Sequence, residues 1–245
     1  AANMAGRFNN RLFKWVDRFI AVSDFIRKQH IRDGFPPSKI VVKNNGIQLP
    51  NLKALKVERL EKVGIAYISR ISESKGAGLI KKLIPQLDLT INIVGDGPGL
   101  DGLKDFCSEY NHEHVKFWNK QSKEKCFSIM ASVVCTVIPS QCGESFSLVA
   151  AESMALSTPV IAADIGGLGP LVKRSGGGVV VKYDDDGAYV DAIRKLNENP
   201  DFASLLGSKG CSYVEENLNS YKNTQKLIEI YQNVIKEKRK DVAYL

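Results

Sequence analysis

Two glutamates with a set separation are the first residues in this sequence that suggest chemistry. Glu144 follows an apolar run over residues 133–140, and Glu152 stands in the helix predicted after it, with seven residues between the two acids. Ionised carboxylates accept charge-assisted hydrogen bonds, which suits them to vicinal hydroxyl groups. The simpler interpretation is a solvent-facing helix residue for Glu152 and a surface or capping acid for Glu144.

Two cations, Arg70 and Lys75, lie just beyond an earlier apolar run over residues 63–69. Open parallel sheets bind ligands beyond the carboxyl ends of their strands. Arginine offers a planar fork of donors and lysine a mobile point charge, so the pair is suited to hold a diphosphate. Charged loops are common on surfaces, but these cations and the two acids together fit a sugar nucleotide.

The helix predicted after Glu144 adds a further anion site to the same crevice. Ser145 or Ser147 is expected to cap this helix through its hydroxyl group. The free N–H groups at the start of the helix then point toward the crevice, where they favour an anion.

A glycine-rich turn over residues 94–100 is the third candidate. Residues 97–102 satisfy the dinucleotide-binding pattern G-x-G-x-x-G, which also requires an acid at the end of the next strand to hold a ribose. Asn119 and Lys120 occupy that place, so the sequence lacks the second feature that a nicotinamide dehydrogenase would need. A tight turn with Pro98 near the helix start is the simpler interpretation.

These residues must be positioned by alternating strands and helices, a pattern typical of βα units around a parallel sheet. The predicted strands cover residues 18–22, 39–42, 63–69, 90–94, 115–117, 133–138, 159–162 and 178–181. The predicted helices cover residues 23–33, 76–87, 99–110, 123–131, 147–156, 186–197 and 220–238. We expect an α/β fold, a Rossmann-like parallel sheet with helices on both faces.

The polar stretch over residues 47–62 is predicted to be an interdomain linker. Residues 1–46 hold too few elements to cover both faces of a parallel sheet, so they are expected to be the tail of a larger lobe. Residues 63–219 are then the ligand-binding domain, and residues 220–245 a C-terminal helix.

Composition narrows the class of protein. The 245 residues carry a net charge of +7, which suits nucleic acid, an acidic membrane surface or a phosphorylated substrate without choosing among them. Five cysteines without a C-x-x-C pair argue against a disulfide framework or a zinc site. No run reaches the length of a membrane span, and the first residues lack the plan of a signal peptide, so a cytoplasmic protein is expected.

With these motifs in order, the sequence resembles the GT4 family of retaining glycosyltransferases, which have the two-lobed GT-B fold. Glu144 and Glu152 match its E-x7-E spacing, and the run from Ser153 to Gly167 is similar to its A-M-A-x-G-x-P-V-I-A-x-x-x-G-G segment. Arg70 with Lys75 matches its G-R-x-x-x-x-K-G element, and residues 94–98 match its G-x-G-P turn. The resemblance runs from about residue 16 to the C-terminal helix, and it implies the C-terminal, donor-binding half of such an enzyme.

The resemblance implies roles for single residues. Arg70 and Lys75 would contact the donor diphosphate, Glu144 the transferred sugar and Glu152 the ribose, with Arg70, Lys75 and Glu144 carrying catalysis. The full set of implied donor-binding residues is Arg70, Lys75, Gly95, Gly97, Trp118, Glu144, Ser145, Phe146, Ser147, Leu148 and Glu152. The implied reaction is a metal-independent hexosyl transfer from a UDP-, GDP- or ADP-linked sugar to a glycan or lipid-linked acceptor, with retention and no cofactor.

The sequence departs from the family pattern in several places. Ser69 replaces the glycine before the arginine, and Ser145 and Ser147 replace the glycines around Phe146. Most of the N-terminal, acceptor-binding lobe has no counterpart, so this chain is expected to bind donor but transfer little by itself. The C-terminal helix is expected to pack back on that lobe.

The expected partners are therefore a nucleotide sugar, an acceptor and the cytoplasmic face of a membrane, without nucleic acid. The alternative is a non-catalytic nucleotide-binding or assembly module. In that interpretation the first two strands pair with a separate lobe or a second copy, because exposed sheet edges invite pairing.

Overall fold

The computed structural model describes residues 13–48 and 62–243, the backbone alone for residues 240–243. By its internal contacts the chain divides into two compact units, Ala1–Gln48 with Asn217–Leu245, and Leu49–Glu216. The linker predicted over residues 47–62 falls almost wholly outside the described residues. Each unit is described by itself.

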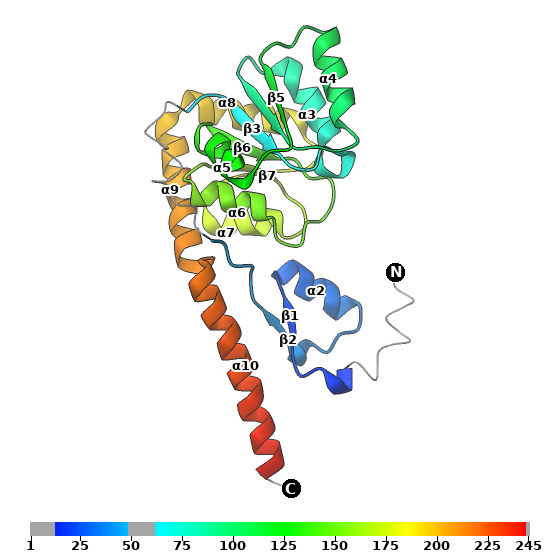
Figure 1. The fold of residues 1–245 in the computed structure, drawn as a ribbon, viewed down its shortest axis with the longest axis vertical. Coiled ribbons are helices and arrows are strands. Elements are labelled where there is room, and N and C mark those ends of the chain that lie inside the picture. The colour runs from blue at the N-terminus through cyan, green and yellow to red at the C-terminus, as the bar shows by residue number, and fades with distance from the viewer. Residues whose placement is uncertain (1–12, 49–61, 244–245) are drawn as a thin grey trace. The chain divides into compact units, whose positions relative to one another are not determined.

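The larger unit is built on a six-stranded, fully parallel sheet in the order β5-β4-β3-β6-β7-β8 (Figure 1). The strands are β3 (Ile65–Ile68), β4 (Ile91–Val94), β5 (Val115–Asn119), β6 (Cys135–Ile138), β7 (Val160–Ala163) and β8 (Gly178–Val181). The helices are α3 (Ala77–Leu83), α4 (Leu100–Glu109), α5 (Lys123–Ala131), α6 (Leu148–Ala155), α7 (Leu168–Ser175), α8 (Asp186–Glu198) and α9 (Pro200–Asn217).

Helices cover both faces of this sheet, as the alternation of strand side chains requires. Ile65 and Tyr67 of β3 join a core cluster with apolar residues of α3, α4 and α8. Ala66 and Ile68, the alternate residues of the same strand, join a second cluster with residues of α5. All four side chains are buried, which is typical of a parallel strand inside an α/β fold. The predicted Rossmann-like architecture is confirmed.

All eight predicted strands and all seven predicted helices are present in the described residues, but the α-helices α7 and α9 were not predicted. The α7 segment contains Gly169 and Pro170, which favour a turn by propensity. In α9, Gly207 and Gly210 lower helix propensity, yet a Cβ on Gly207 would lie 2.3 Å from the Ser157 carbonyl oxygen. Tertiary packing thus requires the glycine that local propensity disfavours.

The smaller unit contains β1 (Phe19–Ala21), α2 (Asp24–Arg32), β2 (Ile40–Val42) and α10 (Ser220–Ala243). β1 and β2 form a two-stranded parallel sheet. The start of α10 joins the end of the β2 segment within this unit, since Ile47 bridges to Asn219 and the buried Asn223 donates to the Asn44 carbonyl oxygen at 2.6 Å. No helix among the described residues is long and apolar enough to cross a membrane.

The end of α6 fixes the start of the strand that follows it. Ser157 has a left-handed φ of 54°, its N–H donates to the Met154 carbonyl oxygen at 3.0 Å, and the Thr158 N–H donates to the Ser153 carbonyl oxygen at 3.1 Å. These two bonds define a Schellman motif, whose left-handed residue is usually glycine. Ser157 therefore holds a backbone conformation that a Cβ disfavours.

Replacing Ser157 with glycine is expected to stabilise the protein by about 0.5–1 kcal/mol, since relief of the left-handed strain exceeds the added entropy of the unfolded chain. Ser208→Gly is the matched control. Ser208 is exposed within α9, so its replacement is expected to cost about 0.5 kcal/mol through lost helix propensity. Urea unfolding midpoints measure both changes. A loss of stability in Ser157→Gly would contradict the account of this helix end.

Candidate functional site

The predicted site residues come from consecutive loops at one edge of the larger unit's sheet. Arg70 follows β3, Gly95 and Gly97 follow β4, Trp118 lies near the end of β5, and Glu144 lies between β6 and α6. Because all six strands are parallel, their carboxyl ends meet at this edge. The sheet order reverses on either side of β3, and such a switch point is where open α/β sheets bind ligands.

An ion pair joins two of the predicted residues directly. Lys75 Nζ lies 2.6 Å from Glu144 Oε1, and the Ser140 hydroxyl donates to the same oxygen at 2.6 Å. The Glu144 side chain is 11% exposed and that of Lys75 33% exposed, so the carboxylate is largely shielded from water while the ammonium remains accessible. Ser140 was not predicted as a site residue, although it follows β6, and Glu144 in the same loop was predicted.

The pKa of the Glu144 carboxyl reflects a competition. Burial alone would raise this pKa, but hydrogen bonds from Lys75 and Ser140, with the Lys75 charge, outweigh burial and hold it below its ordinary value. Glu144 is therefore ionised at neutral pH, so both of its carboxylate oxygens act only as acceptors.

Two hydrogen bonds fix the loop that carries Lys75. The buried Tyr67 hydroxyl donates to the Lys75 carbonyl oxygen at 3.1 Å, and burial raises the pKa of Tyr67 to about 12, so the hydroxyl keeps its proton. The Gln141 N–H donates to the Ser74 carbonyl oxygen at 3.0 Å, which ties this loop to the one that carries Glu144.

The glycine-rich turn supports the Arg70 loop by close backbone approach. A Cβ on Gly95 would lie 1.8 Å from the Ser69 carbonyl oxygen, and one on Gly97 would lie 2.4 Å from the Ile71 carbonyl oxygen. Both glycines also have φ values above 130°. The simpler interpretation, a tight βα turn, thus accounts for both. Arg70 itself is exposed and has no ion pair among the described residues.

A second glycine pair, which was not predicted as part of the site, supports the Glu144 loop. A Cβ on Gly166 would lie 2.6 Å from the Glu144 backbone nitrogen, and one on Gly167 would lie 2.5 Å from the Ser145 carbonyl oxygen. The Gly167 N–H donates to the Glu144 carbonyl oxygen at 2.6 Å. These contacts fix the backbone that presents the carboxylate.

The start of α6 corrects the predicted serine cap. Ser147 occupies the N-cap position but makes no capping hydrogen bond, because its backbone is left-handed, with φ 75° and ψ 93°. Ser145 is exposed, and Leu148 is exposed to 51%. Phe146 is exposed to only 2%, so it packs beneath the loop and does not face solvent.

The second acid has a cationic partner that was not predicted. Lys123 Nζ, at the start of α5, lies 3.1 Å from Glu152 Oε1, and the Glu152 side chain is only 16% exposed. Glu152 is thus neither a plain solvent-facing residue nor part of the Lys75–Glu144 ion pair. One feature of the sequence could have indicated this partner: Lys123 is the first residue of its helix, where the helix dipole disfavours a cation.

Trp118 is held on the sheet edge by two contacts. Its indole N–H donates to Asn92 Oδ1 at 3.0 Å, and Lys125 Nζ lies 4.5 Å from the ring centroid. The ring packs partly buried against the α5 side of the core. Its predicted contact with a donor stays a prediction.

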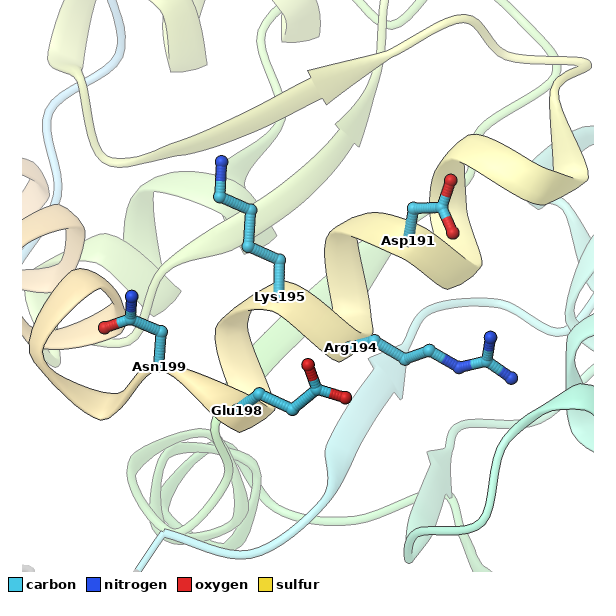
Figure 2. A pocket seen from close by; sticks show the side chains of 5 residues that line it. All are labelled: Asp191, Arg194, Lys195, Glu198 and Asn199. Carbon is cyan, nitrogen blue, oxygen red and sulfur yellow. The ribbon is translucent and has the colours of Figure 1, made fainter.

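Two hollows in the larger unit lie away from this edge. One of about 510 Å³ lies over α8 and is lined by Asp191, Arg194, Lys195, Glu198 and Asn199 (Figure 2). The other, of about 1290 Å³, includes Gly64, Thr90, Val134 and Pro159, which precede strands. Figure 2 shows that the α8 side chains fan outward along one helix, so they do not converge on a ligand. Within the described residues, no three His, Cys, Asp or Glu side chains gather to hold a metal ion.

Replacing Glu144 with glutamine is expected to lower stability by about 1–2 kcal/mol at neutral pH, because the ion pair with Lys75 becomes a weaker hydrogen bond from the ammonium to a neutral amide. The folded-state pKa of Glu144 lies below its ordinary value of 4.5, so this contribution is present above pH 4.5. It is lost as the pH falls through the lowered pKa, and the two proteins then converge in stability.

Urea unfolding across this pH range measures the effect, with Glu113→Gln as the control. Glu113 is exposed and has no ion pair in the described chain, so its replacement is expected to change stability by less than about 0.5 kcal/mol. A gap between wild type and Glu144→Gln that does not depend on pH would contradict the ion-pair account.

Comparison with solved structures places this geometry in a known fold. The chain superposes with a TM-score of 0.83 on the Anabaena HepE protein in complex with UDP, at 19% identity, covering 95% of this chain and 68% of that one. It superposes with a TM-score of 0.75 on the sucrose-phosphate synthase of Thermosynechococcus elongatus, at 24% identity, covering 89% of this chain and 58% of that one. The chain therefore shares its fold with the matching parts of these two structures.

Comparison with sequences is consistent with this fold. The chain is 28% identical over 194 residues to an uncharacterized glycosyltransferase of Methanocaldococcus jannaschii, covering 79% of this chain and 53% of that protein. It is 33% identical over 203 residues to the D-inositol 3-phosphate glycosyltransferase of Mycobacterium marinum, covering 74% of this chain and 43% of that protein. It thus spans about half the length of these relatives. Residues 51–212, more than half of the chain, match the model of one family, so this protein belongs to the glycosyl transferases group 1.

Proposed function

We propose that this chain binds a UDP-, GDP- or ADP-linked sugar at the carboxyl edge of its six-stranded sheet and serves its transfer as the donor-binding half of a GT4 enzyme. The observation that carries the proposal is the Lys75–Glu144 ion pair, bonded to Ser140 and set in the same edge as the exposed Arg70. The HepE structures, in which that protein is in complex with UDP or with UDP-glucose, support the same class of ligand.

Each charged residue has a role that its surroundings favour. Arg70 has no ion pair among the described residues, which leaves its guanidinium group ready for a phosphate. Lys75 has three N–H donors, so it can hold Glu144 and still donate to a phosphate. Glu144 accepts hydrogen bonds from hydroxyl groups of the sugar, and Glu152 from those of the ribose.

Catalysis in this proposal is electrostatic. The sugar leaves a diphosphate, and negative charge grows on the bridging oxygen as the bond breaks. Fixed cations stabilise this charge more in the transition state than in the bound donor, which lowers the barrier. Arg70 and Lys75 supply that charge without a metal ion or cofactor. In this proposal a hexosyl group is transferred, with retention, to a glycan or lipid-linked acceptor that is held outside these residues. NMR of the product's anomeric proton tests the retention.

Titration calorimetry with UDP, GDP and ADP tests the donor site directly. One of the three is expected to bind, and Arg70→Ala is expected to weaken that binding by about tenfold, the value of one lost charge-assisted contact. Binding of the corresponding nucleoside, which has no phosphate, is expected to stay unchanged. Because Arg70 is exposed, its replacement leaves the fold intact.

The matched control for this titration is Arg194→Ala. Arg194 is an arginine of α8 that donates to the Gln86 carbonyl oxygen and lines the hollow in Figure 2. It is expected to leave nucleotide affinity unchanged. If no nucleoside diphosphate bound the folded wild type, the donor site would be withdrawn, and a stable dimer would favour the assembly module.

The assembly module is supported by one feature of the smaller unit. In the described residues β1 and β2 pair only with each other, and such short parallel strands are normally buried within larger sheets. Their free edges are open to a separate lobe or a second copy of this chain.

A glycan or lipid-linked acceptor at the cytoplasmic face of a membrane completes the proposal. Support comes from α10, whose exposed apolar residues include Tyr231 and Ile235, while Lys236 and Arg239 are exposed cations nearby. In a flotation assay the protein is expected to float with anionic liposomes at low salt. At high salt it is expected to stay behind, because salt screens the electrostatic attraction. Equal flotation on neutral liposomes would remove the electrostatic part of this proposal.

A further inference from the structure

Lys123 stands where local electrostatics disfavours a cation. It is the first residue of α5, and the Ser122 hydroxyl caps this helix by accepting from the Lys125 N–H at 3.2 Å. The start of a helix carries a partial positive charge, so acids are favoured there and lysines are not. A contact that offsets this small cost would explain a lysine at this position.

Two contacts supply that interaction and fix the ammonium group. Lys123 Nζ lies 3.1 Å from Glu152 Oε1, and it lies 5.2 Å from the centroid of the buried Phe127 ring one turn along the helix. The ion pair is unsymmetrical, because the Lys123 side chain is 57% exposed and that of Glu152 only 16% exposed. The carboxylate is thus held in a shielded place by a cation that reaches it from solvent.

The geometry leaves half of the Glu152 carboxylate available. The ion pair engages Oε1, and no hydrogen bond to Oε2 is found among the described residues. A carboxylate has about four acceptor positions, so one cation does not saturate it. A carboxylate with one oxygen anchored loses less freedom when the other oxygen binds a ligand.

We propose that Lys123 is a positioning residue, which anchors one oxygen of Glu152 so that the other accepts hydrogen bonds from the ribose hydroxyl groups of the donor. This proposal rests on the proposed donor site, since it needs a ribose at Glu152. It gives α5 a role in nucleotide recognition, in addition to the roles of the two acids and two cations of the motif.

The test compares a nucleoside diphosphate that binds the wild type with its 2′,3′-dideoxy counterpart. The readout is the ratio of the two dissociation constants, which isolates the hydroxyl groups. The wild type is expected to prefer the ribose form by about tenfold, and Lys123→Met is expected to reduce this preference to about twofold. Lys123→Arg, which keeps a donor at the same place, is expected to restore most of it.

The controls distinguish the positioning role of Lys123 from a general effect of positive charge and from a loss of folding. Lys120→Met removes an exposed positive charge just before α5 and is expected to leave the ratio unchanged. Glu152→Gln is expected to lower the ratio as Lys123→Met does, and combining the two changes is expected to add little. Thermal unfolding without nucleotide establishes that each variant is folded, and Lys123→Gln is a second neutral variant.

The outcomes are distinct. An unchanged ratio in a folded Lys123→Met or Lys123→Gln variant would overturn the positioning role. A larger ratio would overturn it as well, since it would mean that Lys123 competes with the ribose for Glu152. Failure of the wild type to bind any nucleoside diphosphate would instead refute the proposed function.

Discussion

Close approach between backbone segments is the constraint on which the candidate site depends. At Gly95, Gly97 and Gly166, a side chain would collide with the backbone of the loop that carries Arg70 or Glu144. Gly76, next to Lys75, has the same property, because its Cβ would lie 2.1 Å from the Pro139 carbonyl oxygen. The charged side chains are therefore presented by loops that brace one another. This bracing restricts the backbone of the loops that carry the charged side chains.

The charges in this frame are arranged as pairs that compensate each other before any ligand binds. A buried carboxylate is costly without a partner, and both acids of the motif have a lysine. In each pair the acid is the shielded member and the lysine the exposed one. An anion that approaches from solvent therefore meets the lysines before the acids.

The sequence predicted the sheet well because short apolar runs bounded by turn residues are local signals. Ile65 to Ile68 are all apolar or aromatic, as a doubly covered strand requires, and every predicted strand is present in the described residues. Helix α9 was missed because Gly207 and Gly210 are required by packing that no local pattern encodes. For the site, the spacing of Arg70, Lys75 and Glu144 indicated a shared edge, and Lys75 and Glu144 are in direct contact.

Sequence reasoning missed one distant and one nearby partner of the acids. Lys123 belongs to another βα unit than Glu152, so no local pattern joins the two. Ser140 is close to Glu144 in the chain, but its contact depends on the conformation of the loop between them. The cap predicted at Ser147 failed for a different reason. A capping hydroxyl group is typically presented from an extended backbone, and Ser147 has a left-handed φ that its residue type does not predict.

The strand order also bears on how the larger unit assembles. β3, β4 and β5 are neighbours both in the chain and in the sheet, so each can add to the preceding one with only a single helix between them. β6 must instead return to the free side of β3, where Cys135 pairs with Ile65, across all of that intervening chain. Pairings between segments so far apart in the chain are typical of slower folding. The edge that carries Lys75 and Glu144 is complete only when this long-range pairing has formed, so ligand binding at this edge would report that β3 and β6 are paired.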